Sequence, residues 1–296
     1  MKIRHLILFS LCIIFNPCYA FSKTMIISSI PVISSIASYI SKQEVKSIVK
    51  ERETGCVEHY SMKPSDAFLI KDADLIIAIG ENFEPFFNNI SKIKKDNASI
   101  IEISKIPGIK ILNKKEKIDN QENNHNHSSE YDFHLWLNPA NAKKIATEIA
   151  KQLAIKNPDK KDFYSKNLND FNKEIDRIVF DIKSIISSHI RINYLLSHDN
   201  LQYFEDFFNI KSSGVISFLD SGEISIRQLL YIKKVIDDNK ISLILVDGDN
   251  YPKGLKTVVD GTKIRLRKID VTGASYKFSE DLYIRIIKDI VNNIYL

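Results

Sequence analysis

The stretch from Asp159 to Ser213 contains no glycine or proline, and this most constrains how the chain of 296 residues can fold. Its apolar residues recur at alternating spacings of four and three, at Tyr164, Leu168, Phe171, Ile175, Ile178, Ile182 and Ile185. This period predicts one amphipathic helix from Asp159 to about Ser188. About 30 residues would span roughly 45 Å, more than one small domain. Because the pattern occurs only once, we expect a rigid strut packed against the protein's own domains, not a coiled coil.

Short β-branched runs alternate with helical patterns on both sides of this strut, and one of these patterns predicts a helix near Glu84 to Ile90. The run Leu75 to Gly80 is continuously apolar and ends in glycine, which is typical of a strand buried on both faces. The alternation predicts an α/β fold with two domains of mostly parallel sheets, joined by the long helix. We expect a signal peptide at 1–20, an N-terminal α/β domain at 21–157, a linking helix at 158–189 and a C-terminal α/β domain at 190–296.

The first twenty residues predict export. Lys2 and Arg4 form a basic start, and the apolar run from Leu6 to Phe15 is too short to cross a bilayer. Small residues occupy both recognition positions of a cleavage site that ends at Ala20. No later apolar stretch is long enough for a membrane helix, so we expect a mature chain that is exported, soluble and not lipid-anchored.

Charge and cysteine content exclude two other classes. The net charge is +5, and the positive charge that remains without the signal peptide is spread along the chain. This distribution gives little reason to expect nucleic acid as a partner. The densest basic run, 263–268, alternates with apolar residues and favours a strand with one solvated face. Only Cys56 remains after cleavage, so an intramolecular disulfide is excluded. Cys56 lies near His59, but a small buried thiol is the simpler interpretation.

A polar stretch at 113–131, with His125 and His127 near its centre, predicts a mobile surface loop. The following segment opens a helix, because Asn138 is a good N-cap and Pro139 suits the first helical position. His134 is therefore expected in a short extended segment directly before a rigid element. A lone histidine of this kind is usually a satisfied core residue, and we expect Trp136 to serve packing.

Four segments place a metal-ligating side chain where a strand ends: Glu58-His59, His134, His198 and Asp270. Open α/β sheets bind ligands at the carboxyl ends of their strands, so a site built from both domains would lie in the cleft between them. Three imidazoles and a carboxylate suit four-coordinate zinc. No H-E-x-x-H motif or cysteine pair is present. A metallohydrolase with three histidines and an open water position is the alternative from another class.

Three of these segments resemble the signatures of a known family, the zinc and manganese solute-binding proteins of ABC importers. The first signature is matched by Glu58 to Asp66 together with 73–77 and 80–84, the second by His134 to Pro139, and the third by His198 to Phe204. The resemblance covers nearly the whole mature chain. It implies a monomeric periplasmic protein with no catalysis, which captures a metal ion and delivers it to an inner-membrane permease with a cytoplasmic ATPase.

Residue by residue, the resemblance implies that His59, His134 and His198 are metal ligands, with Asp270 as the fourth. Val271-Thr272-Gly273 replaces the usual Pro-Leu-Gly after this aspartate, and Asp247-Gly248-Asp249 replaces the usual Glu-Pro-Gln. Glu58 or a water molecule is therefore the alternative fourth ligand. Manganese members usually carry a carboxylate where His198 stands, so we expect Zn²⁺ as cargo, with manganese or iron as the alternative. Asp199 and Tyr203 are candidates for orienting the histidines.

Overall fold

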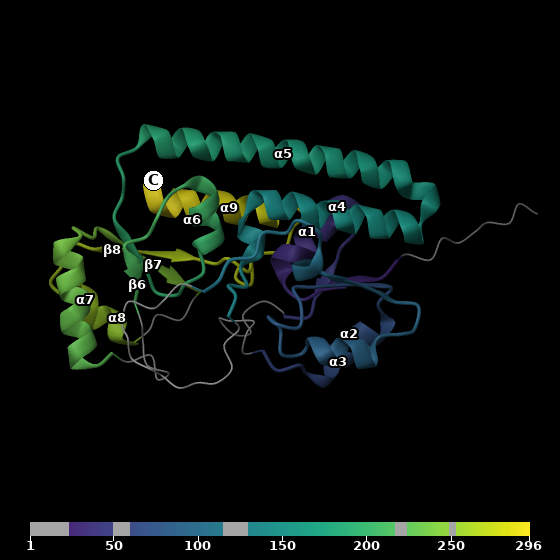
Figure 1. The fold of residues 1–296 in the computed structure, drawn as a ribbon, viewed down its shortest axis with the longest axis horizontal. Helices are drawn as coiled ribbons and strands as arrows, with labels where there is room; N and C mark the ends of the chain where they lie inside the picture. Colours follow the sequence, from purple (N-terminus) through teal and green to yellow (C-terminus); the bar gives the residue numbers. More distant parts are fainter. Residues whose placement is uncertain (1–23, 50–59, 115–129, 217–223, 249–252) are drawn as a thin grey trace, which may run out of the picture.

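The computed structural model describes residues 24–49, 60–114, 130–216, 224–248 and 253–296 (Figure 1). Two four-stranded sheets, ordered β2-β1-β3-β4 and β6-β5-β7-β8, lie along one long helix, α5 (Lys161–Ser188). Every strand pair in both sheets is parallel. This arrangement confirms the predicted α/β fold with two parallel sheets and a long connecting helix.

The first sheet contains β1 (Ile26–Ser28), β2 (Lys46–Ser47), β3 (Leu75–Ala78) and β4 (Ser99–Glu102). Its helices are α1 (Pro31–Ser41), α2 (Pro64–Asp72), α3 (Phe87–Ile93) and α4 (Pro139–Lys156). All four residues of β3 are buried, as its continuous apolar run predicts. Helix α3 starts later than the helical pattern near Glu84 suggests. The reason is that the Glu84 side chain turns back and accepts hydrogen bonds from Ile79 N (2.9 Å) and Gly80 N (3.3 Å), which closes the turn after β3.

The second sheet contains β5 (Tyr194–Leu196), β6 (Gly214–Val215), β7 (Leu243–Asp247) and β8 (Arg265–Ile269). Its helices are α6 (Gln202–Phe208), α7 (Ile226–Asp238), α8 (Lys253–Val259) and α9 (Leu282–Tyr295). The basic run lies mostly in β8, at the edge of the sheet. The run is therefore an edge strand, as predicted, but its exposed residues Arg265 and Lys268 are three positions apart and so project to opposite faces, which differs from the single solvated face expected.

Helix α5 packs along α1, α4 and α9, as Figure 1 shows. Its predicted apolar stripe is the buried face, with Tyr164, Phe171, Ile175, Ile178 and Ile182 inside. These side chains belong to one continuous core that includes both faces of the first sheet, α9 and part of the second sheet. A smaller core lies beneath α7 and α8. Because most of the core is shared, packing fixes the placement of the two sheets relative to each other.

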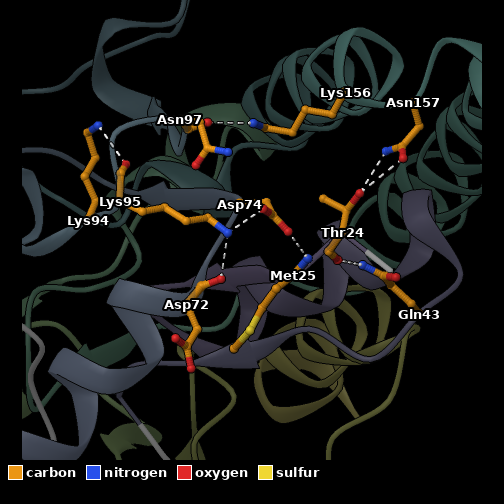
Figure 2. Close-up of polar contacts among 10 residues, drawn as sticks. All are labelled: Thr24, Met25, Gln43, Asp72, Asp74, Lys94, Lys95, Asn97, Lys156 and Asn157. Atoms are coloured by element: carbon orange, nitrogen blue, oxygen red, sulfur yellow. Dashed lines mark hydrogen bonds and ion pairs between the residues drawn. The ribbon is translucent and has the colours of Figure 1, made fainter. Parts of the chain in front are cut away.

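Polar contacts close the edge of the first sheet at which its strands begin (Figure 2). Asp74 accepts a hydrogen bond from Met25 N (2.7 Å) and pairs with the Lys95 ammonium (2.6 Å). Burial alone would raise the pKa of the Asp74 carboxyl, but Lys95 and the Met25 N–H outweigh it and lower that pKa. Asn157, at the end of α4, donates to Thr24 Oγ1 (2.9 Å). These contacts lie at the edge where β1 and β3 begin, opposite the edge where the two strands end.

Candidate metal centre

His134 sits at the start of a 3-10 turn, Leu135–Leu137, that leads into α4. The expected extended segment is therefore a turn. The expected cap is present: Asn138 Oδ1 accepts from Ala140 N (2.8 Å) and Asn141 N (3.3 Å), with Pro139 at the first helical position. His134 is only 4% exposed, and its neighbours Phe133 and Leu135 are buried too, so the surrounding packing holds its ring in place.

The Asp132 carboxylate orients the His134 ring. Asp132 Oδ1 lies 2.8 Å from His134 Nδ1 and accepts from His134 N at 2.9 Å. When Nδ1–H donates to a carboxylate, Nε2 carries the lone pair that can ligate a metal. The Tyr203 hydroxyl donates to the Asp132 carbonyl (2.9 Å) and accepts from Leu112 N (2.9 Å). Tyr203 thus contacts the Asp132 backbone rather than a histidine, and its supporting role stays a prediction.

Trp136 joins this segment to the second sheet. Its indole Nε1 donates to the Val271 carbonyl (2.8 Å), in the loop after β8. The Tyr283 hydroxyl, on α9, donates to the Trp136 carbonyl (3.1 Å). Trp136 is 0% exposed, which confirms that it serves packing. The segment that carries His134 is therefore held against the loop after β8 and against α9.

His198 follows β5 and lies beside His134. The two ring centroids are 5.8 Å apart, at an interplanar angle of 77°. The two residues are 64 positions apart in the chain; His134 precedes α4, which packs with the first sheet, and His198 follows β5 of the second. Two of the expected ligands thus meet between the two α/β units, where strand β5 ends.

Asp270 directly follows β8, but its carboxylate is engaged with its own loop. Oδ1 accepts hydrogen bonds from Thr272 N (2.9 Å), Thr272 Oγ1 (2.9 Å) and Gly273 N (2.8 Å). Oδ2 accepts from Ser275 N (2.6 Å) and Ser275 Oγ (2.7 Å). The side chain therefore shapes the loop that replaces the family's Pro-Leu-Gly, and its assignment as a ligand stays a prediction.

Asp247, the last residue of β7, lies near the histidine pair and was not among the ligands expected from the sequence. Burial raises the pKa of its carboxyl to about 7. The charge of a protonated His134 lowers this pKa, and the neighbouring Asp270 raises it further. Asn200, which is fully buried, interacts with the same carboxylate. A carboxylate directly after the apolar run 243–246 was the available signal, since strand ends are where ligands bind in such sheets.

Two expected site residues, Glu58 and His59, lie outside the described part of the chain, as do Cys56 and the loop histidines His125 and His127. Tyr60, which follows His59, is anchored, because its hydroxyl donates to Asp66 Oδ2 (2.7 Å) at the start of α2. Its ring also packs edge-on against Phe86 (5.7 Å). Among the described residues, no three His, Cys, Asp or Glu side chains are placed to hold one ion. The histidine pair is thus the part of the expected site that the structure assembles.

Comparison with known sequences supports a single family. The family model for the zinc-uptake complex component A, periplasmic, matches residues 26–295. A high-affinity zinc uptake system protein ZnuA of Brucella abortus is 26% identical over 269 residues, covering 80% of each chain. The protein of the same name from Yersinia pestis is 24% identical over 249 residues, covering 79% of this chain and 78% of the relative.

Solved structures share the fold. A crystal structure of ZnuA superposes with a TM-score of 0.75 at 23% identity, covering 92% of this chain and all of the other. A Zn(II)-bound mutant variant of AdcAII from Streptococcus pneumoniae gives 0.74 at 18% identity, and a Mn-bound periplasmic metal binding protein from candidatus Liberibacter asiaticus gives 0.71 at 21%, with the same coverage. With a family model matched over nearly its whole length, the chain belongs to the family of periplasmic zinc-uptake complex component A.

Proposed function

We propose that this protein captures Zn²⁺ in the periplasm and delivers it to an ABC permease. The observation that carries the proposal is the pair of rings, His134 and His198, which come from the two α/β units and have centroids 5.8 Å apart. Asp132 holds one of them in the tautomer that ligates through Nε2. The names of the relatives, high-affinity zinc uptake system proteins, support the same cargo.

We propose His59 as the third imidazole ligand. For the fourth position, the sequence alone suggests Asp270, with Glu58 or a water molecule as the alternative; the choice between carboxylates is taken up below. Three imidazoles favour zinc, whereas manganese is better served by carboxylate and water oxygens. Structural neighbours include both zinc-bound and manganese-bound proteins, so manganese is the second candidate cargo. Asp132 and Asp270 are occupied by structural hydrogen bonds, which favours binding over hydrolysis.

The location and partners follow from the same proposal. Residues 1–20 would direct export and be removed near Ala20. In the part of the chain that the structure describes, no helix is both long and apolar enough to cross a membrane. We propose that the protein acts as a monomer, and that its receiver is an inner-membrane permease with a cytoplasmic ATPase.

Metal titration of the mature, metal-free protein tests the cargo. We expect one zinc ion per chain by elemental analysis, and a zinc affinity that a chelator competition can measure. His134→Ala and His198→Ala should each abolish tight binding, while His189→Ala, at the exposed end of α5, should not change it. Absence of tight metal binding would contradict the proposed function, and manganese displacing zinc at comparable concentrations would contradict the zinc assignment.

A further inference from the structure

Asp247 and Asp270 are two carboxylates at the ends of neighbouring strands, and either could face the captured ion. We infer that Asp247, rather than Asp270, supplies the carboxylate ligand. This inference rests on the proposed function and names a ligand that neither the family motifs nor the sequence reasoning assigned.

Strand register puts Asp247 next to the histidines. Leu196 of β5 pairs with Leu245 of β7, so continuing the register by two residues places His198 opposite Asp247. Asp247 N donates to Ser197 Oγ (3.0 Å), which shows that the two strand ends stay together up to that point. Asp247 in turn pairs with Ile269 of β8, so Asp270 lies one residue beyond and one strand further from β5. Asp247 is thus the carboxylate on the strand adjacent to the His198 strand.

The hydrogen bonds of Asp270 oppose its use as a ligand. An ionised carboxylate offers about four lone-pair sites. Asp270 already accepts five hydrogen bonds from its own loop, three on Oδ1 and two on Oδ2. A metal ion could bind only if the loop gave up some of these bonds. Two of them come from Thr272 and Ser275 side chains, in the segment where this chain departs from the family pattern.

The surroundings of Asp247 lack this saturation and favour a cation. Asn200 and Gly248 lie near its carboxylate, which is also within electrostatic range of His134 and Asp270. Two neighbouring carboxylates, both partly buried, repel each other, and a divalent ion between Asp247 and the histidines would offset that repulsion. Because no three ligating side chains are preassembled among the described residues, binding would draw Asp247 and the two rings together.

A thiol at the ligating position gives a direct test with Co²⁺. In a mature Cys56→Ser background, which is otherwise free of thiols, Asp247→Cys and Asp270→Cys form a matched pair. A thiolate bound to Co²⁺ produces a charge-transfer band in the near ultraviolet, whereas a nearby unbound thiol does not. We expect the band on adding one equivalent of Co²⁺ to Asp247→Cys and not to Asp270→Cys. A band in Asp270→Cys, or no band in Asp247→Cys, would overturn the inference.

Zinc affinity gives a second test. Loss of a residue that supports a metal ligand typically weakens metal binding by roughly 10–100-fold. Asp247→Asn removes a ligand itself, so it should weaken zinc binding by at least as much. Asp270→Asn should instead lower the unfolding temperature of the metal-free protein and leave zinc affinity within a factor of about 3. Equal affinity of Asp247→Asn and the parent would refute the inference. A Cys56→Ser parent that bound neither zinc nor cobalt would refute the proposed function itself, so the two failures are distinguishable.

Discussion

The contact between Asp132 and His134 allows a quantitative prediction for Asp132→Asn. The carboxylate makes two hydrogen bonds to this histidine, at 2.8 Å to Nδ1 and 2.9 Å from the backbone N–H. The side chains of both residues are almost fully buried, at 3% and 5% exposure, so solvent screens the contact very little. The substitution preserves the shape and one acceptor oxygen but removes the charge.

The expected cost follows from the strength of the bond that changes. A hydrogen bond to a charged group contributes about 1.5–3 kcal/mol and a neutral one about 0.5–1.5 kcal/mol, so the loss is about 1–1.5 kcal/mol. That corresponds to about 10-fold in zinc affinity, at the lower end of the roughly 10–100-fold seen for residues that support ligating histidines. Asp132→Ala should cost more and should also reduce folding stability, because the buried His134 N–H would lose its acceptor.

Chelator competition on the metal-free variants measures this effect. Asp170→Asn is the matched control, because Asp170 is exposed on α5 and pairs only across the helix surface with Lys166 (2.8 Å). We expect its zinc affinity to equal that of the parent. If Asp132→Asn binds zinc within a factor of about 2 of the parent, Asp132 does not tune His134 and the reasoning is wrong.

Three further predictions concern stability and selectivity. Burial raises the pKa of Glu84 from 4.5 to about 7, so the folded protein should lose up to about 3 kcal/mol of stability as pH rises from 4.5 to 7. Glu84→Gln should therefore raise the unfolding temperature at pH 8 and change it little below pH 4.5, and an equal effect at both pH values would contradict this. Asn138→Ala should destabilise the protein by about 0.5–2 kcal/mol in denaturant titration, through loss of the α4 cap; an unchanged midpoint would show that the cap is dispensable. His198→Glu should shift selectivity toward manganese in a competitive titration, and unchanged selectivity would argue against the role of imidazole at this position.

Local sequence determined the elements of this fold. The four-three spacing of apolar residues in 164–185 became the buried face of α5, because helical periodicity depends only on neighbours along the chain. The apolar run Leu75 to Gly80 formed the buried strand β3, because a short continuous apolar run is also a local signal. Asn138 and Pro139 determined where α4 begins, since capping is also a contact between residues close in sequence. The positions of His134 and His198 at the edges of elements followed from these boundaries.

The roles of the acidic side chains were decided by tertiary structure. Asp132, Asp247 and Asp270 look alike in the sequence, yet one orients His134, one ends β7 beside Ser197 and one holds its own loop. Glu84 likewise closes a turn where the pattern suggested a helix. A carboxylate takes the partners that the surrounding backbone presents, and these depend on strand register and loop shape. Those features arise only when distant segments pack together, so the sequence could place Asp247 and Asp270 at strand ends but could not distinguish their tasks.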